Sequence, residues 1–226
     1  MTPTLLKRHL ISDSLILGIS CLILLLFIPI GGKVDLYLIQ PWISQAGDFF
    51  YRNNQYLTYW NHGIFKYIMI VVYCSFLLLW LLSFKLEGLK PNRLLYGYMF
   101  WVSALSTALI GLFKSQSRHD CPWNMLQPTA TGYVWDFSAT QGHCFPGGHA
   151  STGFALMTGY FVYRLIQPKR AYFYLLAGLV IGFVMGWGQM MRGAHFLSHN
   201  LWTAWYVFAF NSIVFMLFFK KLQTKI

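Results

Sequence analysis

Most of this chain consists of apolar runs, each close to the length that a helix needs to cross a bilayer. A helix that crosses the hydrocarbon layer needs about 20 apolar residues, because it rises about 1.5 Å per residue. Hydrophobic residues make up 57 % of the 226 residues and charged residues only 10 %, whereas soluble domains carry roughly a quarter charged residues. The sequence therefore predicts an all-α integral membrane protein with a single domain over residues 1–226. Its six expected spans lie at about residues 14–30, 64–84, 94–113, 149–166, 171–191 and 196–219.

Lysine and arginine are distributed unevenly between the two ends of these spans. The two termini and the turns at 85–93 and 164–170 carry eleven basic residues, and the opposite side carries six. Because basic segments stay on the cytoplasmic side, both termini are expected in the cytoplasm. The net charge of +11 is then explained by membrane topology and by attraction to anionic lipid headgroups. No nucleic-acid partner is therefore expected. The segment 114–148 would lie on the outer face, which is periplasmic in a bacterial inner membrane.

Two features near the first span carry further expectations. Residues 34–62 are too polar to cross a membrane and too aromatic to avoid its surface, so an interfacial helix or lid is expected between the first two spans. Asp13 precedes the first apolar run, and its simplest role is to cap the N-terminus of that helix.

The four cysteines fall into two pairs by location. Cys121 and Cys144 lie on the expected outer face, where an oxidising compartment would permit a disulfide between them. Cys21 and Cys74 lie inside expected spans and are interpreted as inert core residues. Four cysteines are too few to predict a disulfide scaffold.

Ionisable side chains gather at the outer ends of the spans. Each has an ordinary explanation when taken alone: Lys114 as an anchor at a helix end, Arg192 and His195 as interface residues, and His119 and His143 as loop residues. Their convergence at one membrane depth, in a chain with few charges, predicts a functional site. The members are Lys114, Arg118, His119, Asp120, His143, His149, Arg192, His195 and His199.

Three segments within this set resemble the motifs of the type-2 phosphatidic acid phosphatase family of membrane lipid phosphatases. Lys114 is followed after six residues by Cys121-Pro122, where the family has Arg-Pro. Pro146-Gly147-Gly148-His149 resembles Pro-Ser-Gly-His. In the third motif, Ser-Arg, five residues, His, three residues and Asp, His195 matches the nucleophile, whereas Gln189 and His199 occupy the Arg and Asp positions. The resemblance covers nearly the whole chain and includes the six-helix topology.

The resemblance implies phosphoryl transfer through a phosphohistidine, without a metal or another cofactor. His195 would attack phosphorus, and His149 would act as general acid and then general base. Lys114 and Arg192 would bind the phosphoryl oxygens, together with the N–H groups of Gly147 and Gly148. Arg118 could replace the arginine missing at position 121.

The substitution of His199 for the family's Asp leaves two questions open. Asp120 or Asp136 could supply the missing negative charge beside His195. In a shifted register, His199 itself, seven residues after Arg192, would be the nucleophile.

Several functions remain compatible with these residues. The motifs are most similar to those of bacterial lipid A phosphatases, and undecaprenyl pyrophosphate, phosphatidylglycerophosphate and transfer of phosphate to a second lipid are alternatives. A different class is a zinc-dependent membrane enzyme that uses His149, His195 and His199 as ligands. A third class is a lipid-binding protein or transporter, which the scarcity of polar residues at mid-membrane disfavours. The partners expected are a phosphorylated lipid and the bilayer; the sequence does not determine the oligomeric state.

Overall fold

The computed structural model describes residues 3–140 and 142–224, so residues 1, 2, 141, 225 and 226 of the expected domain lie outside the described part. The long helices are α1 (Pro3–Leu26), α3 (Phe65–Leu82), α4 (Arg93–Gln116), α8 (Pro168–Met191) and α9 (Leu197–Gln223). The shorter elements are α2 (Lys33–Ile39), η1 (Gln40–Trp42), η2 (Leu57–Ile64), η3 (Glu87–Asn92), α5 (Pro122–Met125), β1 (Leu126–Thr129), β2 (Gly132–Trp135), α6 (Gly148–Phe154), η4 (Ala155–Met157) and α7 (Thr158–Tyr163).

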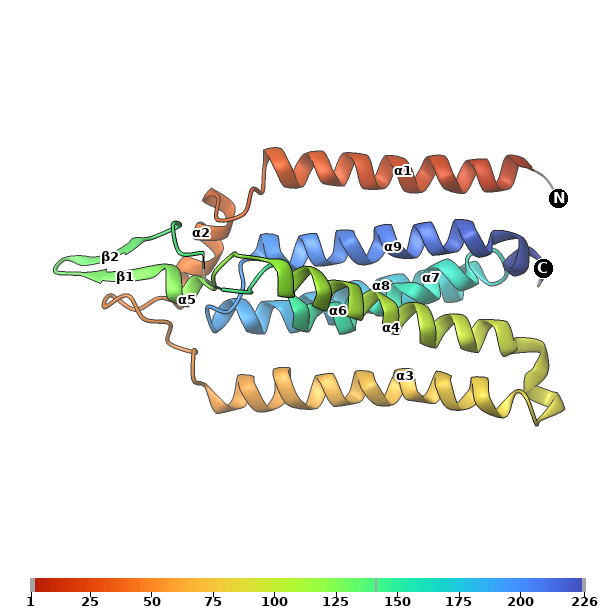
Figure 1. Ribbon diagram of the computed structural model, residues 1–226. Helices are drawn as coiled ribbons and strands as arrows, with labels where there is room; N and C mark the ends of the chain where they lie inside the picture. The colour runs from red at the N-terminus through yellow and green to blue at the C-terminus, as the bar shows by residue number, and fades with distance from the viewer. Residues whose placement is uncertain (1–2, 141, 225–226) are drawn as a thin grey trace.

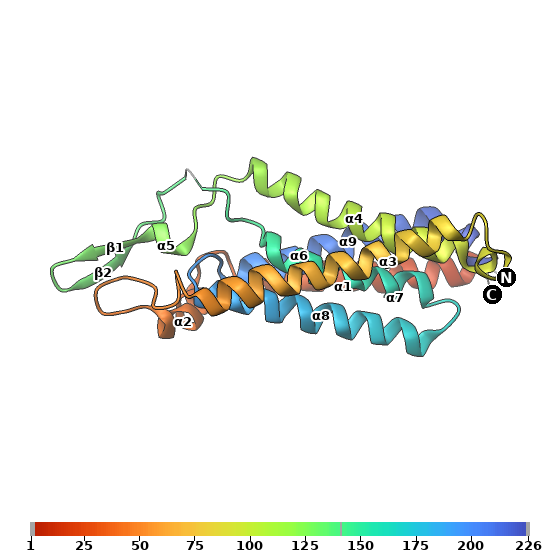
Figure 2. The same cartoon turned by 90° about the horizontal axis from the view of Figure 1, so that it is seen from below.

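The helices form an elongated bundle with both chain ends at one end and the β-hairpin at the other (Figure 1). In the described part of the chain, five helices are long and apolar enough to cross a membrane. This agrees with a helical membrane protein, although six spans were expected. The remaining apolar run, 149–166, is divided into α6, η4 and α7, which follow one another along the bundle between α4 and α8 (Figure 2).

Small residues let this divided helix pack closely against α8. A Cβ atom on Gly153 would lie only 2.6 Å from the backbone nitrogen of Gly182, and one on Gly178 would lie 2.9 Å from that of Met157. Such backbone proximity is typical of helices that associate inside a membrane. The α6–α7 segment is therefore held in the centre of the bundle, where Phe154 and Phe161 are fully buried.

The first helix begins much earlier than the apolar run, and the expected role of Asp13 was wrong. Asp13 lies inside α1 and is fully buried, rather than at an N-terminus. Its two carboxylate oxygens each accept a hydrogen bond of 2.9 Å from the Arg164 guanidinium, and one also accepts from Ser212 Oγ at 2.8 Å. The pairing partner is 151 residues away, so the local sequence could not reveal that the helix continues through Asp13.

The segment between the first two long helices, where an interfacial helix or lid was expected, contains the short helices α2 and η1 and then an irregular stretch that ends at η2. The η2 turn is π-helical and continues directly into α3, so this helix begins at Leu57 rather than at residue 64. Cys74 on α3 is exposed on the outside of the bundle, contrary to its interpretation as a core residue.

A small cap lies at the end of the bundle opposite the two termini (Figure 1). It consists of α2, η1, the loop with Phe49, α5 and the hairpin of β1 and β2, whose strands were not predicted from the sequence. β1 and β2 pair antiparallel, with Leu126 opposite Trp135 and Thr129 opposite Gly132. One apolar cluster joins this hairpin to the rest of the cap and to the start of α9; its buried members are Ile39, Phe49, Met125, Leu126 and Phe196. The cap therefore packs directly on the segment that carries His195 and His199.

Removal of one charge of the buried pair should destabilise the protein strongly. Asp13→Asn leaves the Arg164 guanidinium buried without its counter-charge, and the loss of one partner of a buried ion pair costs roughly 3–5 kcal/mol. Thermal unfolding in detergent should show a clearly lower midpoint. Glu87→Gln, which breaks the exposed pair with Lys90, is the control and should change the midpoint little. Equal midpoints for the two variants would contradict an anchoring role for the Asp13 pair.

Candidate active site

The start of α9 brings His195 and His199 together. His195 lies in the connection after α8, His199 lies in the first turn of α9, and their exposed fractions are 2 % and 0 %. The two Nδ1 atoms are 3.4 Å apart and the ring centroids are 5.6 Å apart. Two imidazole nitrogens at this distance interact favourably only if one carries a proton and the other accepts it.

Glycine at the end of α8 shapes this connection. Gly193 has φ +76°, which L-residues rarely adopt, and its N–H donates to the Met190 carbonyl at 2.9 Å. A Cβ atom at this position would lie 2.5 Å from the Phe49 ring. The chain therefore turns sharply enough for His195 to point back into the bundle.

Aromatic side chains enclose the His199 ring. Phe145 and Phe196 lie 5.5 and 5.4 Å from it, centroid to centroid, and His119 lies at 6.4 Å. Within the described residues, His199 Nε2 is buried and has no hydrogen-bond partner. His119, which was interpreted as an ordinary loop residue, is thus a neighbour of the histidine pair.

His149 and Lys114 complete the group on the bundle side. The His149 ring, in the first turn of α6, is 6.5 Å from that of His195. Lys114, in the last turn of α4, lies against Gly148, where a Cβ atom would be 3.6 Å from Lys114 Nζ. Helices α4, α6 and α9, together with the α8–α9 connection, therefore bring three histidines and one lysine to one end of the bundle.

Burial keeps His195 neutral. Desolvation lowers its pKa well below the ordinary 6.5, and the neighbouring His199, Lys114 and His149 lower the pKa further, whereas the Cys144 backbone raises it. A neutral imidazole has a lone pair on one nitrogen, so His195 can act as a nucleophile or a base at neutral pH without first losing a proton.

Gly147 does not have the expected free N–H group. Its N–H donates to the His199 carbonyl at 3.2 Å, and its carbonyl accepts from Thr203 Oγ1 at 3.2 Å. A Cβ atom on Gly147 would lie 2.5 Å from Asn200 Oδ1. Glycine at this position therefore permits close packing on α9 instead of phosphate binding.

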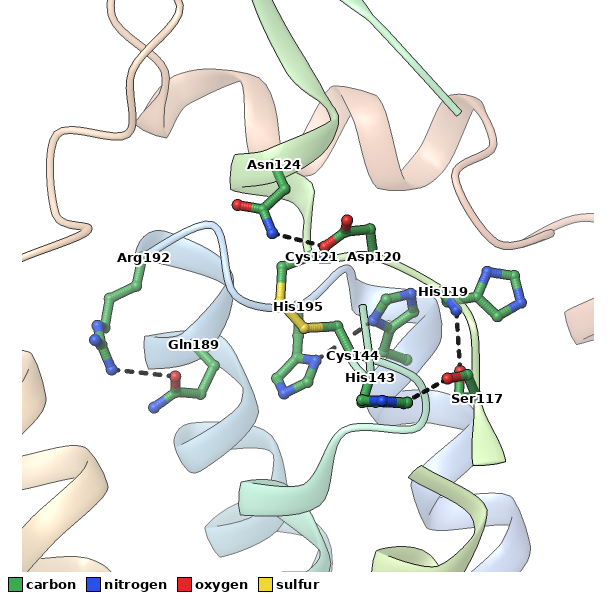
Figure 3. The surroundings of a disulfide bond; sticks show 11 residues. Ser117, His119, Asp120, Cys121, Asn124, His143, Cys144, Gln189, Arg192 and His195 are labelled. Atoms are coloured by element: carbon green, nitrogen blue, oxygen red, sulfur yellow. Dashed lines mark hydrogen bonds between the residues drawn. A yellow bond between two sulfur atoms is a disulfide. The ribbon is translucent and has the colours of Figure 1, made fainter. Parts of the chain in front are cut away.

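Arg192 points away from the histidine pair. Its Nε donates to the Arg52 carbonyl at 3.2 Å and its Nη1 donates to Gln189 Oε1 at 3.3 Å. Figure 3 shows Arg192 and His195 on opposite sides of Gln189. The guanidinium instead lines an open cavity of about 670 Å³ together with Asn53, Gln55, Thr58, Tyr59 and Gly63.

The other charged candidates are also not directed at His195. Arg118 is exposed, and it forms no hydrogen bond or ion pair within the described part of the chain. Asp120 accepts from Cys121 N and Asn124 Nδ2, both at 2.7 Å, at the start of α5. Asp136 accepts from Ser138 in the exposed segment that follows β2. Neither aspartate therefore replaces the family's carboxylate beside His195, because local donors hold both.

A disulfide joins Cys121 to Cys144 above His195 (Figure 3). Cys144 N also donates to the His119 carbonyl at 2.9 Å, and Trp123 N donates to the Gly193 carbonyl at 2.9 Å. His143 Nδ1 lies 2.6 Å from the Ser117 carbonyl. The segment before α6 is therefore tied covalently to the segment before α5, and α5 itself is joined by a hydrogen bond to the α8–α9 connection.

Asp35 was missed by the sequence analysis. This fully buried carboxylate of α2 accepts hydrogen bonds at the start of α9, from Ser198 N at 2.9 Å and from Ser198 Oγ. The sequence did contain an indication of this role. The chain has only six acidic residues, and Asp35 is the one that lies in the apolar part of the segment 34–62.

The histidines are not arranged as a metal centre. Within residues 3–140 and 142–224, no group of three or more His, Cys, Asp or Glu side chains could hold a metal ion. The three histidines and Lys114 form a mostly buried group with aromatic neighbours, suited to hold an anionic group next to an imidazole.

Loss of the disulfide should destabilise the cap by the same amount whichever cysteine is changed. For a sequence separation of 23, the loop-closure entropy corresponds to about 3 kcal/mol. Cys121→Ser, Cys144→Ser and the double variant should therefore share one lowered unfolding midpoint, and Cys74→Ala should keep that of the wild type. A double variant much less stable than either single variant would contradict a bond between these two residues, as would two free thiols in non-reducing mass mapping.

Comparison with protein families identifies the helical part that holds these residues. The family model described as PAP2 superfamily matches residues 95–223, which is more than half of the 226 residues. Comparisons with curated proteins and with solved structures give no match. The matched range begins in α4 and ends with α9, so it contains Lys114, His149, His195 and His199. The chain belongs to the PAP2 superfamily, whose members are phosphatases.

Proposed function

We propose that the protein is a membrane lipid phosphatase that removes phosphate through a phosphohistidine on His195. The observation that carries this proposal is the buried pair of His195 and His199, with His149 and Lys114 beside it, at one end of a bundle of membrane-length helices. Family membership supports phosphatase chemistry. The position at the end of the spans supports a substrate whose phosphate lies at the membrane surface.

In the first step, His195 Nε2 attacks phosphorus and the bond to the lipid oxygen breaks. His149 donates a proton to that oxygen, so the lipid leaves as a neutral alcohol or, from a pyrophosphate, as a protonated phosphate. In the second step, water attacks the phosphohistidine, His149 takes its proton, and the N–P bond breaks to release inorganic phosphate. Lys114 neutralises charge on the phosphoryl oxygens in both steps, the main requirement of phosphoryl transfer.

His199 acts as the hydrogen-bond acceptor for His195. For Nε2 of His195 to hold a lone pair, its Nδ1 must carry the proton, which it donates to His199 Nδ1 at 3.4 Å. The register with His199 as nucleophile is disfavoured, because its Nε2 is buried and its ring has Phe145, Phe196 and His119 as neighbours. Gly148, next to Lys114, would contact the phosphate of an arriving lipid. Arg118 and Arg192, which are not directed at His195, would contact other parts of its headgroup.

Among phosphorylated lipids, lipid A is our first choice of substrate, and undecaprenyl pyrophosphate and phosphatidylglycerophosphate are alternatives. The proposed location is a bacterial inner membrane, crossed six times, with cytoplasmic termini and a periplasmic active site. The eleven basic residues at one end support this orientation. Transfer of phosphate to a second lipid would use the same first step.

Phosphate release from these lipids in detergent with EDTA tests the proposal. His195→Ala should lower the rate at least about a thousandfold, because it removes the nucleophile. His149→Ala should lower it by about 10²–10⁴, as expected for loss of a general acid and base. His143→Ala is the matched control, because this exposed histidine has its ring nitrogen on the Ser117 carbonyl rather than on His195, and its rate should be near that of the wild type.

Three results would contradict parts of the proposal. Loss of activity in EDTA would favour the zinc-dependent alternative. An active His195→Ala together with an inactive His199→Ala would shift the register to His199. Absence of release from every lipid would favour a lipid-binding protein.

Replacement of His199 by the family's carboxylate should accelerate the first step. In His199→Asp, the His195 Nδ1–H donates to a charged acceptor, and such hydrogen bonds are about 1–2 kcal/mol stronger than neutral ones. We expect about a tenfold higher rate of phosphoenzyme formation, with the acid limb of the pH profile moved to higher pH because the carboxylate raises the pKa of His195. His199→Asn, which supplies a neutral acceptor, should leave both quantities near the wild type. A large loss in His199→Asp would show that His199 does more than accept this hydrogen bond.

A further inference from the structure

The first turn of α9 depends on a carboxylate from another helix. Phe196, at the N-cap position, provides no side-chain cap. Asp35 of α2 takes this role: Oδ1 accepts from Ser198 N at 2.9 Å, and Oδ2 accepts from Ser198 Oγ and from Gly31 N at 2.9 Å. A helix N-terminus has unpaired N–H groups that a carboxylate satisfies well. Here the two partners are 163 residues apart.

Asp35 is buried without a positive partner. Its exposed fraction is 0 %, and the only ion pairs in the described part of the chain are Lys90–Glu87 and Arg164–Asp13. Burial raises the pKa of Asp35, although the hydrogen bonds from Ser198 and Gly31 oppose this shift. A serine or asparagine at position 196 would cap the helix locally at a lower desolvation cost. The use of a distant buried carboxylate indicates a requirement for more than helix capping.

Ser198 connects Asp35 to the histidines. It directly precedes His199 and follows His195 by three residues, so fixing both its N–H and its Oγ fixes the turn that carries the pair. The Nδ1 contact of 3.4 Å is already long for a hydrogen bond. A shift of this turn by about 1 Å would break the contact and misdirect His195, and displacements of that size can cost about a hundredfold in rate.

We propose that Asp35 is a positioning residue that holds the first turn of α9 so that His195 and His199 keep their mutual geometry. This inference rests on the proposed phosphatase function for its kinetic consequence. Asp35 acts through Ser198 rather than on the substrate. It also links the cap to the reaction centre, because α2 belongs to the cap and its residue Ile39 packs in the same apolar cluster as Phe196.

The substitution Asp35→Asn tests this role with nearly the same volume. An amide presents only one acceptor oxygen, so its NH₂ group faces either the Ser198 N–H or, in the other orientation, both Ser198 Oγ and the Gly31 N–H. Each orientation therefore sets the NH₂ group against a backbone N–H donor. We expect kcat to fall about tenfold or more with KM within about twofold. Ser198→Ala should lower kcat less, and the double variant Asp35→Asn/Ser198→Ala should be no slower than Asp35→Asn, because the two residues form one unit.

A second aspartate–serine pair in the chain has the same type of hydrogen bonds and serves as the matched control. Asp136 Oδ1 accepts from Ser138 N at 2.9 Å and from Ser138 Oγ at 2.6 Å, but this pair lies in the exposed segment after β2. Asp136→Asn and Ser138→Ala should keep the kcat of the wild type. Unfolding midpoints of all variants, measured in detergent, separate a loss of positioning from a loss of folding.

A spectroscopic measurement separates this inference from the proposed function. In protein labelled with ¹⁵N-histidine, Asp35→Asn should shift the Nδ1 resonances of His195 and His199 and leave that of His143 unchanged. Unchanged resonances and an unchanged kcat would overturn the positioning role, and so would a fall in unfolding midpoint that alone accounts for the lost activity. If the wild type releases no phosphate from any lipid but the resonances shift, the phosphatase proposal fails and the positioning of the pair stands.

Discussion

The absence of water inside a bilayer is the constraint on which the rest of this structure depends. Backbone groups there must pair within the segment, so the apolar runs become helices. Ionisable side chains must lie at the ends of the helices or find a partner. Asp13 and Arg164 show the second solution, because each is buried and the two are joined by two hydrogen bonds. His149, His195 and Lys114 show the first, since all three lie at one end of the bundle.

The same constraint explains why the reaction centre is assembled from helix ends. A helix interior can offer only side chains separated by turns, whereas the ends of α4, α6 and α9 and the α8–α9 connection meet at one depth. The cap then removes much of the remaining water through its apolar cluster around Phe49 and Phe196. Because water is excluded, His195 stays neutral and each nearby charge acts more strongly than it would in solution.

The sequence was sufficient for features that depend on local composition and spacing. Apolar runs gave most helices within a few residues, and motif spacing indicated His149, His195 and Lys114, which the structure brings together. The sequence was not sufficient where a residue far away in the chain determines the position of a side chain or the extent of a helix. Arg164 extends α1 through Asp13, Ser198 recruits Asp35, and Gln189 with the Arg52 carbonyl turns Arg192 away from His195. The hairpin was also missed, because its strands are only four residues each and contain proline and glycine.

This chain has His199 where the family has an aspartate, and the change has two opposite electrostatic effects on the site around His195. A carboxylate would raise the basicity of His195, but it would also repel an arriving phosphate dianion. With a neutral imidazole in its place, the side-chain charges near His195 are positive, from Lys114 and from His149 when it is protonated. The two carboxylate side chains nearest to His195 along the chain are both held by local donors, Asp136 by Ser138 and Asp120 by Asn124. The site therefore binds an anion more favourably but has a weaker nucleophile. The reactivity of His195 must then depend on its geometry relative to His199, because no carboxylate raises its basicity.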